Sequence, residues 1–298
     1  MLTQTNEEAS IIVALLRRHG INGKLIQSMD GFQFRNMAEM RYFMKYIAKH
    51  IDSPRIPDAV WEEALKSTIC AYGRSTALAY VERCVAQFSE INRDKYLSDL
   101  REFVNESSVE DFCDLAGAEV VVSTIHKAKG KEFDDVYMMV TGNYPKGNSL
   151  FRRYYVGMTR ARKRLFIHTD GDLFDSICAD GHHVDSAAYP LPEEIMLQMS
   201  LKDVYLDYSR HRKREVLALQ SGDPLVYSDG FLFDPRSNIP VVRLSLKMQN
   251  ALADWKVKGY SVVSSSVQFV VAWKPKDAPR EEPETAVLLA DLILKYNQ

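Results

Sequence analysis

The stretch of sequence from residue 120 to residue 169 constrains the fold of this chain more than any other part. It contains three short apolar runs bounded by polar residues and glycines: Val120–Val122, Val136–Val140 and Leu165–Ile167. Short continuous runs of this kind are typical of strands that are buried on both faces of a sheet. The stretch therefore predicts three buried strands.

A helix is predicted between the second and third of these strands. Its apolar residues recur at the spacing of one helix face: Phe151, Tyr154, Tyr155 and Met158. The order strand, loop, strand, helix, strand is that of an open α/β sheet, in which ligands bind at the carboxyl ends of the strands. We therefore expect Thr124–Asp134 and the end of this helix to gather at that edge of the sheet.

The composition is that of an ordinary globular protein. The 298 residues can form one large domain or two smaller ones, and 46% of them are hydrophobic and 26% charged. The net charge of -2 means that a contact with nucleic acid must come from local basic clusters. Four scattered cysteines without a C-x-x-C pattern argue against a zinc site and fit a reducing cytoplasm. With no signal peptide and no apolar run that could span a bilayer, we expect a cytoplasmic protein without a membrane contact.

Residues 1–57 and 118–170 read as two parts of one α/β lobe. The first part opens with a capping-box pattern, in which Thr5 and Glu8 stand three residues apart at the start of a helix. Residues 58–117 read as helix throughout and contain no strand-like run. We interpret them as a small helical insertion in the lobe, and the alternative is that they form an integral part of it.

The sequence changes character after the third apolar run. Residues 171–199 are rich in glycine, aspartate, histidine and proline and read as a linker. Residues 200–298 read as a smaller α+β module, with one helix over Ser200–Leu219 and a last helix over Ala286–Tyr296. The first of these helices carries the basic run Arg210–Arg214, which is a solvated helix face or, alternatively, a contact to a phosphate backbone.

The loop Thr124–Asp134 collects groups that can meet phosphates, namely a hydroxyl, an imidazole, lysine ammonium groups and a glycine. Gly130 would let the backbone approach a ligand or adopt a positive φ, and Glu132 is an acceptor suited to a ribose hydroxyl. The alternative is an ordinary polar loop in which Glu132 pairs with a nearby lysine. The residues alone leave both interpretations open.

Arg160 stands at the end of the predicted helix. An arginine beside a sheet edge can direct its planar guanidinium at a neighbouring phosphate. The alternative is a basic helix end that complements the helix dipole, and we consider this the better interpretation of Arg162–Arg164. For Arg160 itself the residue pattern does not decide.

Two segments resemble motifs of a known family. Thr124–Phe133 (TIHKAKGKEF) and Tyr155–Ala161 (YVGMTRA) resemble motifs V and VI of superfamily 1 DNA helicases of the UvrD/Rep/PcrA type. Leu2–Ser10 (LTQTNEEAS) looks like the strand-to-helix segment of the same lobe, and Gly31–Arg35 (GFQFR) like the aromatic segment that follows. The resemblance implies a second RecA-like lobe of the P-loop NTPase type, called 2A, interrupted by a reduced form of the insertion called 2B. Residues 200–298 lie outside the resemblance.

The resemblance also implies roles for individual residues. Arg160 matches the catalytic arginine that stabilises charge on the γ-phosphate of ATP. Glu132 matches a ribose contact, and Gly130 lets the loop lie close to the nucleotide. Four residues match or adjoin positions that contact single-stranded DNA: Asn6, Thr124, His126 and Lys127.

The sequence departs from the family pattern at two positions within the matching segments. Gln4 stands where family members often carry arginine, and Lys131 stands where they tend to have an apolar residue. There is also no G-x-x-x-x-G-K-[ST] motif and no DExx-type acidic pair, so we expect the main residues for ATP and Mg²⁺ to lie outside this chain and predict no metal site within it. We therefore interpret the chain as the C-terminal part of an ATP-dependent helicase, or alternatively a degenerate protein. We expect it to be inactive as an ATPase by itself.

The expected partners are single-stranded DNA or DNA junctions, the N-terminal RecA-like lobe of a parent enzyme, and a DNA-repair protein bound through residues 200–298. The alternative is a stand-alone, non-catalytic module that binds DNA or a repair protein. Lys127, Lys129 and Arg210–Arg214 would then face the phosphates.

Overall fold

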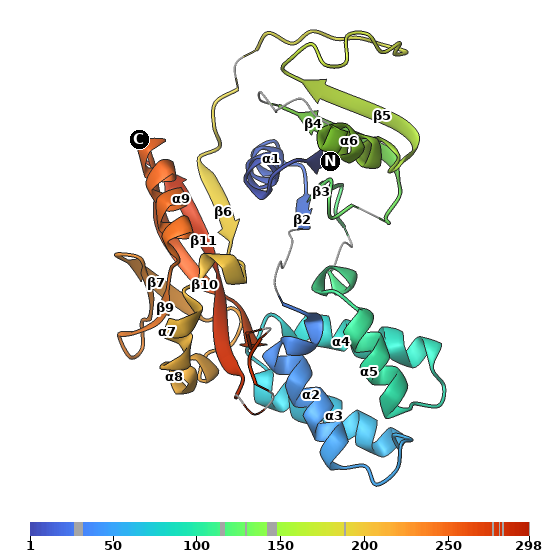
Figure 1. Ribbon diagram of the computed structural model, residues 1–298, viewed down its shortest axis with the longest axis vertical. Coiled ribbons are helices and arrows are strands. Elements are labelled where there is room, and N and C mark those ends of the chain that lie inside the picture. The colour runs from blue at the N-terminus through green and yellow to red at the C-terminus, as the bar shows by residue number, and fades with distance from the viewer. Residues whose placement is uncertain are drawn as a thin grey trace. The chain divides into compact units, whose positions relative to one another are not determined.

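The structure is a computed structural model that describes most of the chain. The described residues are 1–26, 32–113, 117–128, 130–141, 148–187, 189–275, 277–279, 281 and 283–297. The chain divides into two compact units, Met1–Ser28 with Leu115–Ile195 and Met29–Asp114 with Met196–Gln298 (Figure 1). Each unit is described below by itself.

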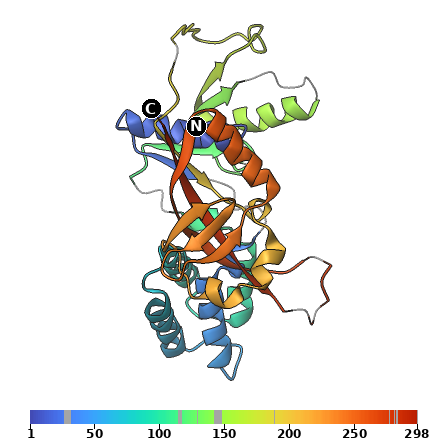
Figure 2. The same ribbon diagram turned by 90° about the vertical axis from the view of Figure 1, so that its left-hand side faces the viewer.

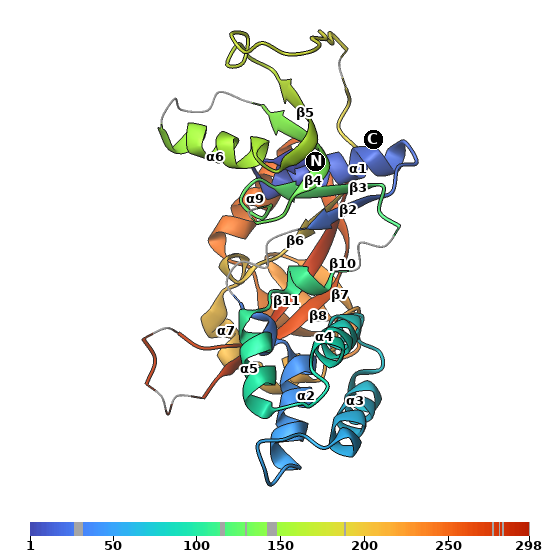
Figure 3. The same ribbon diagram turned by 90° about the vertical axis from the view of Figure 1, so that its right-hand side faces the viewer.

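The first unit is built on a five-stranded sheet with the order β2-β3-β1-β4-β5, in which the strand pairs are parallel (Figure 3). The strands are β1 (Leu2–Thr3), β2 (Gly23–Ile26), β3 (Val120–Thr124), β4 (Phe133–Val140) and β5 (Ala161–Thr169). The three apolar runs therefore form strands, and the predicted parallel α/β lobe is confirmed.

Helix α1 (Asn6–Arg18) covers one face of this sheet. It starts with the predicted capping box, in which the Glu8 amide donates to the Thr5 hydroxyl at 3.1 Å and the Thr5 amide donates to the Glu8 carboxylate at 3.1 Å. On its inner side, Ala9 and Val13 pack against Val122 of β3. The capping box fixes where the helix begins, directly after the carboxyl end of β1.

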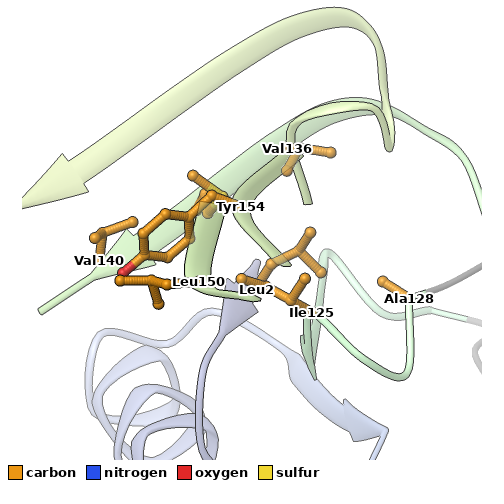
Figure 4. Close-up of a cluster of buried hydrophobic side chains, with 8 residues drawn as sticks. Leu2, Ile125, Ala128, Val136, Val140, Leu150 and Tyr154 are labelled. Carbon is orange, nitrogen blue, oxygen red and sulfur yellow. The ribbon is translucent and has the colours of Figure 1, made fainter. Parts of the chain in front are cut away.

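Helix α6 (Asn148–Met158) covers the opposite face. Its Leu150 and Tyr154 are buried with residues of β1, β4 and the loop after β3 (Figure 4). Two members of the predicted apolar stripe do not belong to it, since Phe151 is 50% and Tyr155 68% exposed. Each follows a buried residue by one position, and successive residues of a helix point about 100° apart.

Strand β5 differs from the prediction of burial on both faces. It is an edge strand, and both Leu165 and Phe166 are 37% exposed. Among the described residues β4 is its sole strand neighbour. An apolar run predicts a strand but not its place in the sheet, which depends on pairing with distant segments.

Residues 32–113 of the second unit are helical, as predicted for the region from residue 58 onward. Their elements are η1 (Phe34–Asn36), α2 (Ala38–Lys49), α3 (Asp58–Tyr72), α4 (Leu78–Ile91), α5 (Leu97–Glu106) and η2 (Val109–Phe112). Trp61 joins two neighbouring helices, with its ring centroid 5.2 Å from that of Phe43 and 5.6 Å from that of Phe88. Phe34, from the segment that resembles a family aromatic motif, packs against Phe112 with the ring centroids 4.6 Å apart, whereas Gly31 lies outside the described residues.

The rest of the second unit is a six-stranded sheet with the order β6-β11-β10-β7-β8-β9 (Figure 2). Its strands are β6 (Glu194–Gln198), β7 (Pro224–Ser228), β8 (Phe231–Asp234), β9 (Ile239–Arg243), β10 (Tyr260–Trp273) and β11 (Thr285–Tyr296). The helices are η3 (Leu201–Asp203), α7 (Leu206–Arg210), α8 (Lys213–Leu217) and α9 (Leu246–Val257). This confirms a separate antiparallel α+β module.

Two of the helix predictions for this module are wrong. Residues 286–296 form strand β11, which pairs antiparallel with β10 along its length. The run is buried on both faces, so it lacks the alternation that distinguishes a strand from a buried helix. Residues 200–219 form three short helical segments instead of one, and the basic run Arg210–Arg214 spans the break between α7 and α8.

The helical segment is joined to this sheet within the second unit. The Thr76 amide donates to the Ser221 carbonyl at 3.0 Å, and Arg74 forms an ion pair with Asp223 at 3.2 Å. A Cβ on Gly222 would lie 2.8 Å from the Thr76 side chain, so the close approach requires glycine. The units thus group residues 32–113 with the C-terminal sheet, whereas we expected residues up to 57 in the α/β lobe. The sequence could not reveal this grouping, because the contacts join segments more than a hundred residues apart.

A partly buried carboxyl group of the second unit, that of Asp291, makes the stability of the unit depend on pH. Burial raises the pKa of Asp291, in β11, to about 7, although a hydrogen bond with Gln198 acts in the opposite direction. Its Oδ1 atom has no hydrogen-bond partner among the described residues. The folded state therefore favours the neutral acid, and its stability falls as the pH rises from about 4, the ordinary aspartate value, towards the raised pKa.

We predict that Asp291→Asn raises the Tm of the chain at pH 8 by at least about 3 °C, because the amide carries no charge to bury. At pH 4 the same substitution should leave the Tm nearly unchanged, since Asp291 of the folded wild type is then protonated and neither side chain carries a charge. Asp254→Asn, at an exposed position of α9, is the control and should have little effect at either pH. Equal effects of Asp291→Asn at the two pH values in calorimetry would contradict the prediction.

Candidate functional site

The loop between β3 and β4 runs from the side of the parallel sheet where the strands end, the carboxyl edge, to the side where they begin, the amino edge. Strand β3 ends at Thr124, opposite Thr3 of β1, whereas β4 begins at Phe133, opposite Ala161 of β5. Parallel strands begin at one edge and end at the opposite one. The expectation that Thr124–Asp134 gathers at the carboxyl edge is therefore wrong, and the candidate residues separate into two groups.

The group at the carboxyl edge lies on a tight turn after β3. The amides of Lys127 and Ala128 donate to the Thr124 carbonyl at 3.0 and 3.2 Å. Ile125 and Ala128 are buried in the cluster under α6 and hold the turn against the sheet (Figure 4). His126 is exposed between them, Lys127 is half-buried and Thr124 is buried. The turn thus presents His126 to solvent on a fixed backbone.

Asn6 joins this group through strand pairing. The Ile125 amide donates to the Thr3 carbonyl at 2.9 Å, so the start of α1 and the turn after β3 lie on neighbouring strand ends. Asn6 is the first residue of α1 and is exposed. The Glu8 carboxylate accepts hydrogen bonds from the Gln4 amide at 2.9 Å and from the Thr141 hydroxyl, after β4, at 3.1 Å. These bonds fix the ends of β1 and β4 relative to each other.

Gln4 has a structural contact that the sequence did not indicate. Its side-chain amide donates to the Tyr154 hydroxyl of α6 at 2.8 Å, and its Oε1 atom is buried without a hydrogen-bond partner among the described residues. The side chain that stands where family members often carry arginine thus links the end of β1 to helix α6. No local pattern predicts such a bond, because it joins residues 150 positions apart.

Arg160 lies at the amino edge, between the end of α6 and the start of β5. Its guanidinium donates to the Val156 carbonyl at 3.0 Å, to the Lys131 carbonyl at 3.3 Å and to the Thr159 hydroxyl at 3.1 Å. Its own carbonyl accepts from the Phe133 amide at 2.8 Å. All the hydrogen-bond acceptors of the guanidinium are neutral, so its charge is not paired with a carboxylate among the described residues. The contacts hold Arg160 beside the loop that carries Glu132.

Glu132 and Gly130 complete the amino-edge group. Gly130 has a φ of +83° and is exposed, as its position in the loop had suggested. Glu132 is exposed, and its carboxylate has no hydrogen-bond or ion-pair partner within the described part of the chain. Lys129 lies outside the described residues. The arrangement places an exposed carboxylate next to a partly buried guanidinium.

The basic residues after Arg160 lie in β5 and not in a helix end, which corrects our interpretation of Arg162–Arg164. Arg162 and Lys163 each contact Asp134 at 2.7 Å, and Arg164 contacts Asp135 at 2.5 Å. The hydrogen bond from Lys163 lowers the pKa of Asp134, and that from Arg164 lowers the pKa of Asp135. The sequence contains the basic run Arg162–Arg164 and the acidic pair Asp134–Asp135. They form ion pairs because of the register between β4 and β5, which the sequence alone does not show.

A comparison with known protein families found a match that covers both candidate edges of the sheet. Residues 59–170 match the family model of the UvrD-like helicase C-terminal domain. The match supports a UvrD-type helicase C-terminal region over these residues. The region spans α3 to β5 and includes both the turn after β3 and Arg160, whereas Asn6 and the C-terminal sheet lie outside it. No curated protein sequence matches the chain.

The match includes α3, α4 and α5 of the helical segment, since it begins at the start of α3, whereas α2 lies outside it. It supports helicase and DNA-binding roles in general and does not assign roles to single residues. Within the described ranges, no helix has the length and apolar character needed to cross a bilayer.

The positive φ of Gly130 gives a test of the loop geometry. We predict that Gly130→Ala lowers the free energy of unfolding by about 1 kcal/mol, because a Cβ is disfavoured in the left-handed region even where space is free. Gly171→Ala is the matched control, since Gly171 also has open space but is not among the glycines with positive φ. Chemical denaturation measures both, and equal effects would contradict the assigned backbone conformation.

Proposed function

We propose that this chain is the C-terminal motor lobe of an ATP-dependent superfamily 1 DNA helicase. The observation that carries the proposal is that the UvrD-like region has Arg160 and Glu132 at one edge of a parallel sheet and Thr124, His126 and Lys127 at the opposite edge. In this proposal Arg160 and Glu132 face the nucleotide at the amino edge. Asn6, Thr124, His126 and Lys127 contact single-stranded DNA at the carboxyl edge.

The chemistry of the amino edge suits phosphoryl transfer. Such reactions are catalysed mainly by positioning and by cations that stabilise charge on the transferred phosphoryl group. Arg160 fits this role because its guanidinium is held by neutral oxygens and keeps its full charge for a phosphate. The exposed carboxylate of Glu132 fits a ribose hydroxyl, and Gly130 leaves the loop open beside it. ATP and Mg²⁺ would be held mainly by the N-terminal lobe of the parent enzyme.

The loop between β3 and β4 offers a physical connection between the two candidate groups. Its first turn carries His126 and its last residues carry Glu132, and Ile125 and Ala128 anchor it in the core beneath α6. A displacement of the residues at the amino edge, where we place the nucleotide, would therefore move the residues at the carboxyl edge, where we place the DNA. The movement would pass through one short segment that is anchored in the core. A role in DNA repair, a cytoplasmic location and a protein partner for residues 200–298 remain predictions.

The nucleotide half of the proposal predicts a specific kinetic effect. The isolated chain should not hydrolyse ATP, with or without single-stranded DNA. In an enzyme reconstituted with a P-loop lobe, Arg160→Ala should lower kcat by about a thousandfold, as loss of an arginine finger does.

Arg162→Ala is the matched control for this measurement, because Arg162 lies two residues away and is paired with Asp134. It should leave kcat nearly unchanged. Two results would contradict the proposal. If the isolated chain hydrolyses ATP with DNA present and loses this activity in Arg160→Ala, the active site is not divided between two lobes as predicted. If Arg160→Ala and Arg162→Ala lower kcat equally, Arg160 does not have its proposed role.

The DNA half predicts a difference between two positive charges at opposite ends of the lobe. We expect Lys127→Ala to weaken binding of an oligo-dT strand several-fold and to reduce the slope of log K against log salt by about one unit. Arg18→Ala also removes one positive charge, but Arg18 stands at the far end of α1 from Asn6 and should have little effect. Fluorescence anisotropy over a range of salt concentrations measures both variants. A larger effect of Arg18→Ala would place the DNA elsewhere.

A further inference from the structure

Strand β5 is an unprotected sheet edge. Among the described residues it pairs with β4 alone, in a register that runs from Phe133 opposite Ala161 to Val140 opposite Thr169. Its outer backbone groups are therefore free to pair with another strand. Its nine residues contain no proline, which would otherwise block such pairing. An extended polypeptide is the kind of ligand that satisfies a row of backbone donors and acceptors.

One face of β5 is also open, which is unusual for a parallel sheet. Sheets of this kind are normally covered on both faces. Helix α1 packs against β3, and α6 packs on the face that carries Val136 and Met138, so the outer half of the α1 face is uncovered. On that half Tyr137 and Phe166 stack at 4.5 Å with an interplanar angle of 9°, and each is 37% exposed. This open half of the sheet is an apolar surface beside a free strand edge.

The charged residues of β5 do not protect its free edge from pairing with another strand. Natural edge strands are often protected by charged side chains that would be buried by a new neighbour. Here Arg162, Lys163 and Arg164 are held by Asp134 and Asp135 of β4, so they lean inward over their own sheet. The carboxyl half, Leu165–Thr169, carries no carboxylate, lysine or arginine.

The sequence of β5 is complementary to itself in the antiparallel direction. With Leu165 opposite its own copy, all nine residues pair and every basic residue meets an uncharged or histidine position: Arg162 with His168, Lys163 with Ile167, and Arg164 with Phe166. No two arginines or lysines lie opposite one another, an arrangement that would be destabilising. Arg164 already lies 5.8 Å from the Phe166 ring within one chain, and the pairing would add the same contact across the interface.

From these observations we infer that β5 is the contact surface of a symmetric homodimer, in which two copies of this chain pair their β5 strands antiparallel about Leu165. The two five-stranded sheets would then form one continuous sheet with a two-fold axis through Leu165. Pairing satisfies the free backbone edge and covers part of the exposed Phe166 and Leu165 side chains. This inference does not depend on the proposed helicase function.

Two substitutions at one position test the pairing. Phe166→Lys places lysine opposite Arg164 of the second copy, whereas Phe166→Glu places a carboxylate there. Both remove the same aromatic ring and add one charge. Sedimentation equilibrium of the full chain should show a dimer for the wild type, with the Phe166→Glu variant associating at least about tenfold more tightly than Phe166→Lys, since each dimer contains two such pairs. Circular dichroism and thermal unfolding check that both variants are folded.

Cross-linking tests the register. In a background with the exposed Cys70 and Cys178 changed to serine, Leu165→Cys should be joined across the two-fold axis by a short bismaleimide. Arg162→Cys is the control, because in this register the two introduced thiols are six strand positions apart, about 20 Å. Cross-linking of Arg162→Cys in place of Leu165→Cys would overturn the register.

Three further results would overturn the inference. The first is a wild-type chain that stays monomeric at all concentrations. The second is equal association of the Phe166→Lys and Phe166→Glu variants, which would indicate non-specific apolar contact. The third is a monomeric chain in which Phe166→Ala weakens binding of oligo-dT, which would assign this sheet face to nucleic acid.

Discussion

The parallel pairing of β1 with β3 is the interaction on which the first unit depends. Strand β1 has two residues, yet it stands at the centre of the sheet, between β3 and β4. Its Leu2 is buried in the same cluster as Tyr154 of α6, and its Thr3 lies opposite Thr124. This register brings the start of α1 beside the turn after β3, although the two are more than a hundred residues apart. Without it the candidate DNA contacts would not lie on neighbouring strand ends.

The same sheet separates the two halves of the proposed activity. A parallel strand places its first and last residues at opposite edges, so the loop between β3 and β4 must cross the lobe. It does so with Ile125 and Ala128 buried and with Gly130 in the left-handed region. The guanidinium of Arg160 then fixes the end of this loop through the Lys131 carbonyl. One segment thus carries residues of both candidate groups on a backbone anchored in the core.

In the second unit, long-range contacts join a helical segment to a sheet. Its helical segment contains much of the UvrD-like region, yet it is held to a sheet that lies outside that region. The junction consists of a backbone hydrogen bond between Thr76 and Ser221, a glycine that permits the approach, and the ion pair of Arg74 with Asp223. The C-terminal sheet therefore supports the helical segment whatever else it binds.

The sequence by itself determined the local elements of the lobe. Apolar runs predicted β3, β4 and β5, the Thr5–Glu8 pattern predicted the start of α1, and the motif around Thr124–Phe133 indicated the likeness to UvrD-like helicases, because these signals depend on residues close together in the chain. Tertiary structure decided the rest. It made β11 a strand and β5 an exposed edge, it paired Arg162–Arg164 with Asp134 and Asp135, and it divided the candidate site between two edges. Each of these outcomes depends on which distant strand lies alongside, and strand register leaves no trace in the local pattern of residues.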